Sequence, residues 1–583
     1  MHPHLTALSD ALDREWRARS DEHARNRALP LPARAAAGFT LYPLDLVSTE
    51  HRSRGRLNAL LRGRDLGEAF QPGDPVVLAP VGRPDDGIAG WIEGVDPSSV
   101  EVRLEGEPDG AGPWAVSRRL DPSVHARQRA AMLRAAEKPK ALAKLLLGME
   151  LPYPPDPLDH PELARLHPDQ RAAAALALGA TEIGLLHGPP GTGKTEVLVA
   201  MLRALKDLGE KPWALADSNA AVDHLALRAG AAGLDVVRIG VSARIGGDVR
   251  ALTLEHRILH GARAAVIQRL TRDATRATGD ALHEVRAAIR EEWSAAKREI
   301  LQGADVLAMT LGTLLTRGED LPDVRTALLD EAGQVSEPAA WGLVGRVRRV
   351  LMAGDPHQLG PVVVGRDPTL ETSLLQRLVA EGFPFPMLTE QRRMHGTLMA
   401  LIQPTYGGRL TAAAHVATRS LPVESPWNTH PARFVDTAGM GHDEARDAHG
   451  SVYNLGEASL LARIWRELRD AGVRPDQVGV VAPYRAQVAQ LRQVLPELEV
   501  ATVNAFQGRE VDVLLASFTR SNPDGELGFV ADARRLNVTL SRARSLFIGV
   551  GDSATLGTSP LFARLVERVG DGYLSGWELP EES

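Results

Sequence analysis

The apolar positions of this chain change their spacing along its length. Residues 5–28 and about 124–147 carry apolar side chains at helical intervals among many charges, so each segment predicts a helix with one narrow apolar stripe. Such a stripe needs a partner, and we expect the two helices to form a stalk. Between them, short apolar runs separated by clusters of Gly, Pro and Asp predict a small β-barrel or sandwich. These runs are residues 76–78, 88–92 and 100–104.

After a proline-rich linker at residues 152–161, strand-like apolar runs alternate with helical patterns. This alternation is typical of parallel sheets with crossover helices. Residues 244–303, a long helical stretch with many arginines, interrupt the alternation and are predicted to be an insertion. The predicted strands are residues 183–186, 213–218, 305–310, 327–332 and 350–355 in a first unit, and 478–482, 499–503, 511–516 and 546–550 in a second.

These patterns predict an α/β protein of five segments. The length of 583 residues exceeds what one hydrophobic core serves, so several domains are expected. The segments are a stalk helix and connector (1–43), a β-barrel (44–120), a second stalk helix and linker (121–160), a first α/β domain (161–365) with its insertion at about 244–303, and a second α/β domain (366–583).

Composition narrows the class of protein. No apolar run approaches the roughly 20 residues of a membrane span, and residues 1–10 lack the apolar core of a signal peptide, so we expect a cytoplasmic protein without membrane contact. The absence of cysteine excludes disulfides and thiolate metal sites. A net charge of −7 neither indicates nor excludes nucleic-acid binding, because a local basic groove is what binds nucleic acid.

The candidate chemistry centres on residues 188–195, which fit the phosphate-binding pattern G-x-x-x-x-G-K-[ST]. Its glycines let backbone N–H groups face the phosphates of a nucleotide, Lys194 reaches the β- and γ-phosphates, and the Thr195 hydroxyl can hold Mg²⁺. A strand before the loop and a helix after it would place the phosphates at a helix N-terminus. We therefore expect ATP and Mg²⁺ as cofactors. The predicted nucleotide-binding residues here are Gly188, Pro189, Pro190, Gly191, Thr192, Gly193, Lys194 and Thr195.

Four further polar residues are candidates for the same site. A predicted strand ends in Asp330 and Glu331, which suits one carboxylate for the metal held by Thr195 and the next for taking a proton from attacking water. Gln358 follows another strand at the edge where open α/β sheets bind ligands. Gln170, at the start of a helix, has the amide needed to pair with adenine. The second unit has no phosphate loop, which favours a nucleotide bound in the cleft between the two units.

Taken in order, these stretches resemble the motifs of superfamily 1B helicases, most closely the branch that includes the nonsense-mediated-decay RNA helicase and the immunoglobulin-mu-binding helicase. The resemblance covers roughly residues 160–553. It implies two tandem RecA-like P-loop domains, with the barrel on its helical stalk and the helical insertion as additions. The matching stretches are residues 167–170, 188–195, 217–223, 330–334, 354–361, 391–395, 483–487, 506–512 and 534–544.

The resemblance implies roles for individual residues. Gln358 would sense the γ-phosphate, and Arg393 and Arg542 would reach it from the second domain as arginine fingers. Glu510 would contact the ribose. The catalytic set is then Lys194, Asp330, Glu331, Gln358, Arg393 and Arg542, and the residues expected to line the path of a nucleic-acid single strand are Ser218, Asn219, Thr310 and Thr502.

Three positions depart from the family pattern. Arg392 stands where the family usually has the tyrosine that stacks on adenine, so we assign Arg392 to the nucleotide site with a guanidinium plane as the substitute. Gly396 stands where proline is usual, and Ser541 replaces a threonine while keeping the hydroxyl. The first departure concerns the choice of base, and the other two are minor.

The sequence therefore predicts an ATP-dependent 5′→3′ helicase or translocase acting on single-stranded or forked DNA or RNA. Two alternatives remain: an ATP-driven remodeller that strips proteins from nucleic acid, and a nucleotide-gated scaffold with negligible turnover. The barrel is expected to be either a nucleic-acid platform or a spacer, and the charges of the insertion either face solvent or contact nucleic acid. We expect a monomer that meets protein partners through the barrel or the insertion. The choice between DNA and RNA stays open.

Overall fold

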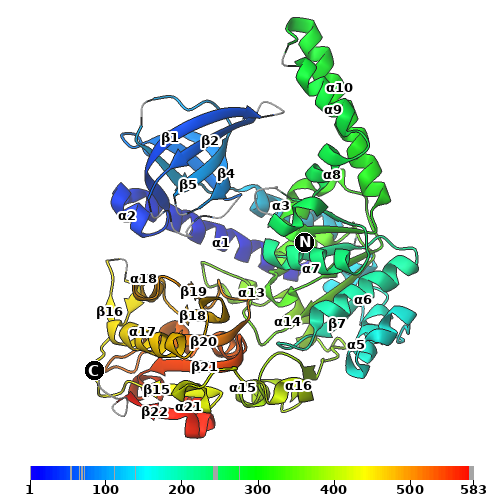
Figure 1. The fold of residues 1–583 in the computed structure, drawn as a ribbon. Helices are drawn as coiled ribbons and strands as arrows, with labels where there is room; N and C mark the ends of the chain where they lie inside the picture. Colours follow the sequence, from blue (N-terminus) through cyan, green and yellow to red (C-terminus); the bar gives the residue numbers. More distant parts are fainter. Residues whose placement is uncertain are drawn as a thin grey trace.

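The computed structural model describes residues 2–52, 56–64, 66, 70, 73–96, 98–110, 112–137, 139–240, 247–274, 276–448 and 450–576. Two α/β domains lie side by side, and a barrel stands over them on a long helix (Figure 1). The beginning of the predicted insertion, up to residue 246, lies outside the described residues. No helix within the described part of the chain is both long enough and apolar enough to span a membrane.

The barrel is closed by six antiparallel strands in the order β1-β2-β5-β4-β3-β6. Its interior is filled by apolar side chains that alternate along the strands, among them Leu61, Val76 and Ile92. The barrel begins at Thr40, inside the segment predicted as connector (1–43). Its strands are β1 (Thr40–Arg52), β2 (Arg56–Arg62), β3 (Pro75–Pro80), β4 (Ile88–Val95), β5 (Ser99–Leu104) and β6 (Trp114–Arg118).

The stalk consists of α1 (Pro3–Ala28) packed against α3 (Ser123–Glu137), with α2 (Leu31–Ala36) at the barrel end. The apolar stripe of α1, which includes Leu5, Leu8 and Leu12, is buried as predicted. The single helix predicted at about 124–147 is wrong. α3 ends at Glu137 and a separate α4 (Ala141–Leu146) follows, because Pro139 between them cannot donate the backbone hydrogen bond of a continuous helix.

The first α/β domain has a parallel six-stranded sheet in the order β7-β12-β11-β8-β10-β9. Each of the five predicted strands is present, and the short β9 was not predicted. The strands are β7 (Ile183–His187), β8 (Trp213–Ala216), β9 (Val236–Arg238), β10 (Val306–Thr310), β11 (Thr326–Leu329) and β12 (Arg349–Gly354). The helices are η1 (Pro161–Arg165), α5 (Pro168–Leu178), α6 (Lys194–Asp207), α7 (Asn219–Ala231), α11 (Leu311–Arg317), η4 (Gly318–Asp320), η5 (Ala332–Gln334), α12 (Glu337–Ala340) and η6 (Trp341–Leu343).

The insertion is helical, as predicted, and α9 and α10 project from the first domain as a finger (Figure 1). Ile258, Ile267 and Ala296 form a small apolar cluster of their own. Arg263 binds both Glu292 (2.8 Å) and Glu299 (2.6 Å) across the helix pair, so this arginine holds the finger together. The elements are η3 (Gly247–Leu252), α8 (Leu254–His260), α9 (Ala264–Ala274) and α10 (Gly279–Gly303).

The second α/β domain repeats the architecture with a parallel sheet in the order β19-β18-β20-β21-β15-β22. The four predicted strands lie together, and β15 and β22 join them. The strands are β15 (Ala432–Asp436), β18 (Val478–Ala482), β19 (Glu499–Thr502), β20 (Val511–Ser517), β21 (Ala543–Gly551) and β22 (Tyr573–Ser575), with two ribbons, β13 (Glu390–Gln391) with β14 (Thr411–Ala412) and β16 (Ala445–Arg446) with β17 (Val452–Tyr453).

Helices cover both faces of this second sheet, with one apolar core on each face, as doubly wound folds require. They are α15 (Gly396–Ile402), η7 (Gln403–Tyr406), α16 (Ala414–Ala417), η8 (Pro426–Thr429), α17 (Leu455–Asp470), η9 (Pro475–Gln477), α18 (Arg485–Val494), η10 (Gly528–Ala531), α19 (Ala533–Leu540), α20 (Ser553–Leu556), α21 (Pro560–Val569) and η11 (Gly570–Gly572).

The residues that follow the predicted domain boundary at 366 still pack against the first α/β domain. In α14 (Leu374–Ala380), which follows the short α13 (Pro368–Glu371), Leu374, Leu375 and Leu378 pack in the same core as Leu329 and Met352 of the first sheet. These apolar side chains complete the first core, although α14 follows the predicted boundary at residue 366.

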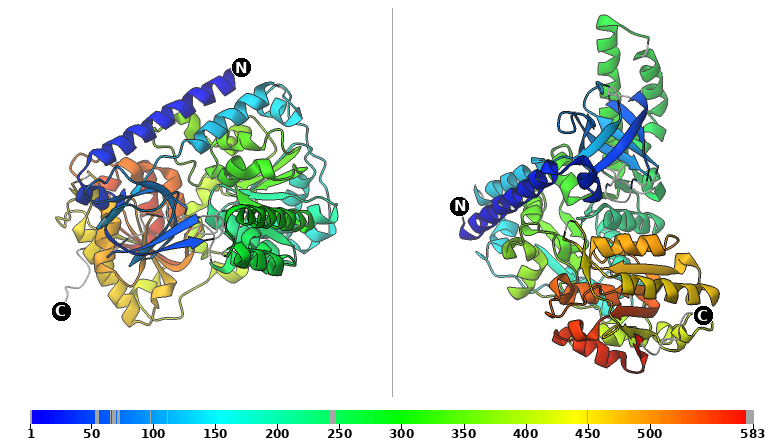
Figure 2. Two further views of the ribbon diagram at one scale, coloured as in Figure 1. Left: turned by 90° about the horizontal axis from the view of Figure 1, so that it is seen from above. Right: turned by 90° about the vertical axis from the view of Figure 1, so that its left-hand side faces the viewer.

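The stalk helix α1 runs from the first α/β domain to the base of the barrel (Figures 1 and 2). On its way it contacts residues 362–367, which precede α13 and α14. Glu15 accepts hydrogen bonds from the backbone N–H groups of Val364 (3.0 Å) and Gly365 (2.8 Å). Arg14 forms a 2.7 Å ion pair with Asp367. The helix that carries the barrel is thus tied to a segment of the first domain that lies close to the joint.

Candidate active site and strand-binding edge

The phosphate loop joins β7 to α6 at the carboxyl edge of the first sheet, as predicted. Gly191 and Gly193 have φ values of +74° and +78°, a backbone region that only glycine adopts without strain. Gly191 has a second constraint, since a Cβ there would lie 2.6 Å from Cβ of Arg393 in the second domain. The loop is therefore shaped to bind phosphates and to let the other domain approach closely.

Lys194 lies between the two predicted carboxylates. Its Nζ is 3.0 Å from Oδ1 of Asp330 and 2.5 Å from Oε1 of Glu331. Burial alone would lower the pKa of Lys194, but the charges of Asp330 and Glu331 outweigh burial and raise it. The three residues form one charged cluster with a cation of the phosphate loop at its centre.

Glu331 has a backbone conformation and an ionised side chain that are typical of active-site residues. Its φ is +50°, which is uncommon for a residue with a side chain and is typical of strained positions in active sites. Burial acts to raise the pKa of Glu331, but the Lys194 ammonium and the Gln334 amide, which donates to Oε2 at 3.1 Å, hold that pKa below its usual range. The carboxylate is therefore ionised and able to accept a proton.

Gln170 contacts the phosphate loop directly. Its side-chain amide donates to the Thr192 carbonyl (2.9 Å), and its carbonyl accepts from the His167 backbone N–H (3.1 Å). Both ends of the buried side chain are thus used to brace the loop and to cap α5. The predicted contact of Gln170 with adenine stays a prediction, and a bracing role was not foreseen.

The two predicted arginine fingers come from the second domain and lie near each other. Arg393 forms an ion pair with Glu510 and donates to the Ser541 carbonyl (3.1 Å). Arg542, buried at the end of α19, donates to the Val538 carbonyl (3.1 Å). Burial, assisted by the charge of Arg393, lowers the pKa of Arg542 to about 10, so the group is still protonated at neutral pH. The charges of Glu510 and Glu331 act in the opposite direction and raise the pKa of Arg542.

A buried polar network connects the domains beside this cluster. Asp355, after β12, accepts from the Gln358 amide (2.9 Å) and from the Tyr406 hydroxyl of the second domain (2.7 Å). His187 Nε2 lies 3.1 Å from the other Asp355 oxygen. Asn537 donates to Tyr406 Oη (2.8 Å). The candidate γ-phosphate sensor Gln358 is therefore hydrogen-bonded to a carboxylate that also binds the opposite domain.

Tyr406 and Asn537 were missed in the sequence. Asn537 lies in one of the motif stretches, yet its amide has no assigned chemistry there, and Tyr406 lies outside all of them. The burial of a tyrosine hydroxyl against an aspartate is visible only in the packed structure.

Arg392 lies next to the phosphate loop, and its side chain is paired with a carboxylate. Its backbone N–H donates to the Gly191 carbonyl (2.8 Å), and its guanidinium pairs with Glu390 (3.1 Å). Glu390 in turn lies 3.6 Å from the His167 ring. An arginine committed to a carboxylate is less free to lie flat against a base than a tyrosine ring.

We therefore expect Arg392→Tyr to sharpen the choice between ATP and GTP, because a ring stacked on the base would hold it where the Gln170 amide can pair with adenine. The measurement is the ratio of kcat/KM for the two nucleotides in both proteins. Arg392→Ala, which removes the guanidinium without adding a ring, is the control and should leave discrimination low. A wild-type protein that already rejects GTP as strongly as Arg392→Tyr would show that residue 392 does not contact the base.

The four residues predicted to line the path of a nucleic-acid strand lie at the carboxyl ends of strands. Thr310 ends β10 and pairs in register with Ala216 of β8, so it is close to Ser218 and Asn219, which follow β8. Ser218 and Thr310 also cap α7 and α11, and Asn219 accepts from the buried Arg238 (2.8 Å). Thr502 ends β19 of the other sheet. Each α/β domain thus contributes residues at the carboxyl ends of its strands to the predicted path of the nucleic acid.

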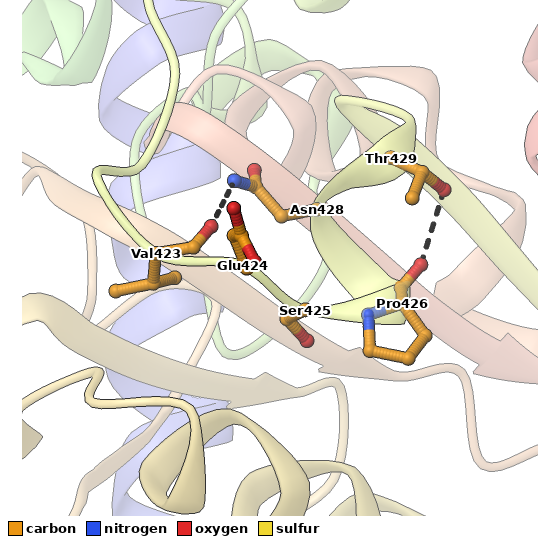
Figure 3. Close-up of a pocket in the computed structure, with 6 residues that line it drawn as sticks. All are labelled: Val423, Glu424, Ser425, Pro426, Asn428 and Thr429. Carbon is orange, nitrogen blue, oxygen red and sulfur yellow. Dashed lines mark hydrogen bonds between the residues drawn. The ribbon is translucent and has the colours of Figure 1, made fainter.

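A pocket elsewhere on the second domain does not belong to this site (Figure 3). Its lining residues are Val423, Glu424, Ser425, Pro426, Asn428 and Thr429, and the hydrogen bonds drawn there, Asn428 to the Val423 carbonyl and Thr429 to the Pro426 carbonyl, are local. None of the predicted site residues lines it. Within the described residues there is also no cluster of three or more His, Asp or Glu side chains able to hold a metal ion by themselves.

Both α/β domains match models of known protein families. Two family models described as "AAA domain" match this chain, one over residues 165–292 and 263–366, the other over residues 370–554. DNA-binding protein SMUBP-2 of Rattus norvegicus is 32% identical over 468 residues, which cover 73% of this chain and 47% of that protein.

Two fungal proteins are similar to the same extent. ATP-dependent helicase NAM7 of Saccharomyces cerevisiae is 31% identical over 446 residues, or 72% of this chain and 45% of that protein. DNA polymerase alpha-associated DNA helicase A of Schizosaccharomyces pombe is 30% identical over 427 residues, or 67% of this chain and 64% of that protein. The matched region therefore spans between 45% and 64% of the length of these three relatives.

Proposed function

Because this chain belongs to the UPF-like branch of the superfamily 1 helicases, we propose that it hydrolyses ATP to move along a nucleic-acid single strand and to separate duplexes with 5′→3′ polarity. The observation that supports this most is the position of Lys194 between Asp330 and Glu331, with Arg393 of the second domain close to Gly191 of the same phosphate loop. An ATP site divided between two domains is what couples hydrolysis to their relative movement.

The residues of the phosphate loop suit a Mg²⁺-bound nucleotide. Asp330 and Glu331 share the single cation of Lys194, so one carboxylate charge remains to attract a metal ion once Lys194 contacts the phosphates. Thr195 and Asp330 would hold Mg²⁺, which when bound neutralises charge on the phosphates. Gln170 would brace the loop, and Glu510, now paired with Arg393, would contact the ribose.

Different side chains would then carry out different parts of the hydrolysis. Lys194 leaves its carboxylates for the β- and γ-phosphates of the substrate, which frees Glu331 to orient water and take its proton. Arg393 and Arg542 stabilise the charge that develops on the transferred phosphoryl group. Gln358 reports the state of the γ-phosphate to Asp355, and Asp355 is bonded to Tyr406 across the domain joint.

Nucleic-acid movement would follow from alternate grip and release. Ser218, Asn219 and Thr310 hold the strand on the first domain and Thr502 holds it on the second, so closing and opening the cleft shifts one set of contacts relative to the other. Contacts to the phosphate backbone make this movement independent of sequence. A monomer in the cytoplasm, with protein partners at the barrel or finger, completes the proposal.

The test measures ATP turnover with matched DNA and RNA single strands, and displacement of a labelled strand from duplexes with a 5′ or a 3′ overhang. Stimulation by single strands together with faster displacement from the 5′ overhang is expected. Stimulation without displacement would instead favour the protein-stripping remodeller, and the absence of turnover would favour a nucleotide-gated scaffold. Faster displacement from the 3′ overhang would reverse the polarity.

A further inference from the structure

An aromatic ring stands exposed where the two α/β domains meet. Phe529 belongs to η10, which precedes α19, and 41% of its surface is exposed to solvent. The guanidinium carbons of Arg366 and Arg535 lie 5.0 Å and 5.1 Å from its ring centroid. Both distances are those of cation–π contacts. An exposed ring held by two arginines offers a flat surface of aromatic and guanidinium planes.

The three residues come from different parts of the fold. Arg366 directly precedes Asp367 in the segment that α1 holds through Glu15 and Arg14, and its φ of +48° turns the chain there. Phe529 and Arg535 belong to the second domain. Arg366 and Phe529 therefore meet only while the two domains keep this arrangement.

The cluster adjoins the predicted strand edge. Arg535 donates to the side-chain carbonyl of Asn504 (3.1 Å), and Asn504 closely follows Thr502, the last residue of β19. Tyr484, which is itself buried, packs 5.8 Å from the Phe529 ring between centroids. The ring is thus held from the interior of the second domain and keeps an exposed surface beside the path predicted for the strand.

The charge of the cluster suits a polyanion. Arg535 and Arg534 share one carboxylate, Asp532, at 3.8 Å and 3.5 Å. No ion pair of Arg366 is found among the described residues, and its side chain is exposed. Three guanidinium groups beside one carboxylate leave a net positive charge, and guanidinium groups bind phosphate oxygens through paired N–H groups.

We propose that Phe529, Arg366 and Arg535 form a nucleotide subsite for the bound single strand. One base stacks on the Phe529–Arg366 surface, and the neighbouring phosphate is held by Arg535. This inference rests on the proposed function, since it assumes that a single strand crosses the edge marked by Thr502. Because Arg366 and Phe529 lie on opposite sides of the joint, the base is gripped in one domain arrangement and released in another.

The experiment measures the affinity of the full chain for a fluorescent single strand of about 12 nucleotides, and for the same strand with abasic residues throughout. Phe529→Ala is expected to weaken binding of the normal strand roughly tenfold, the scale of one lost base stack, and to leave binding of the abasic strand unchanged. Phe529→Trp should retain binding of the normal strand. Tyr153→Ala, which removes an aromatic side chain 84% exposed in the linker, is the control and should change neither affinity.

Equal loss on both strands would overturn the subsite, because the ring would then act only by holding the domains together. Unchanged affinity of Phe529→Ala for the normal strand would overturn it as well, while leaving the proposed function intact. A wild-type protein that binds neither strand would remove the proposed function itself. Phe529→Leu, which keeps an apolar side chain, provides the measurement should Phe529→Ala fail to fold, and is expected to show the same selective loss.

Discussion

Arg542→Ala is expected to lower ATP turnover by on the order of 10³-fold while changing ATP affinity only slightly, as for other arginine fingers. The structure gives the reason. Arg542 is 3% exposed and is held by the Val538 carbonyl and the Ser541 hydroxyl (3.0 Å), so its charge is already oriented before any nucleotide arrives. A cation that is oriented in advance stabilises the transition state more than the bound substrate, because negative charge develops there during the reaction.

The measurement is kcat and KM of the single-strand-stimulated reaction, together with nucleotide affinity from a fluorescent ATP analogue. Arg564→Ala, which removes an exposed arginine on α21, is the matched control and should behave as the wild type. Arg542→Lys keeps the positive charge but loses the planar guanidinium group, so its ATP turnover should lie between those of the wild type and Arg542→Ala. A loss confined to nucleotide affinity would show that Arg542 only binds.

Glu331→Gln is expected to bind ATP but to turn it over about 10²- to 10⁴-fold more slowly, the usual contribution of a general base. The amide keeps the size of the carboxylate and cannot accept a proton from water. Although burial acts to raise the pKa of Glu331, the Lys194 ammonium holds it below its usual range, so the carboxylate is ionised before the nucleotide binds. Asp330, the proposed Mg²⁺ ligand, is unchanged in the variant.

Turnover and nucleotide affinity are measured in parallel for Glu331→Gln and for Lys194→Ala. The second variant loses the contact to the phosphates and should lose affinity as well as hydrolysis, which separates binding from chemistry. Gln334→Ala removes the 3.1 Å hydrogen bond to Glu331 without removing the base, and should have a much smaller effect. Undiminished turnover in Glu331→Gln would show that another group takes the proton.

The local elements of the fold were predictable from the sequence because their signals are local. Most strands of the two sheets are almost fully buried and appear as short apolar runs, and the phosphate loop is encoded by glycines at fixed spacing. Asp330 and Glu331 were predicted from their place after such a run. The three-residue strands β9 and β22 escaped prediction because so short a run carries too little pattern to separate it from a turn, and β15 escaped because Arg433 interrupts its apolar residues.

The second stalk helix and the packing of α14 show two different reasons why apolar spacing alone was insufficient. Pro139 alone divides α3 from α4, although the apolar spacing continues across it. Leu374, Leu375 and Leu378 carry an ordinary helical pattern, and nothing in it states which of two cores they enter. Only the packing against Leu329 and Met352 assigns them to the first domain.

The sequence by itself determined the α/β class, the phosphate loop, the two carboxylates and the order of the family motifs, since each depends on residues close together in the chain. The tertiary structure alone decided which distant groups meet: Lys194 with Asp330 and Glu331, Tyr406 with Asp355, Gln170 with the Thr192 carbonyl, and Phe529 with Arg366. Gln170 and Thr192 are 22 positions apart, and Lys194 and Glu331 are 137 positions apart. Contacts over such separations arise from the packing of strands, helices and whole domains against one another, and spacing along the chain does not encode that packing.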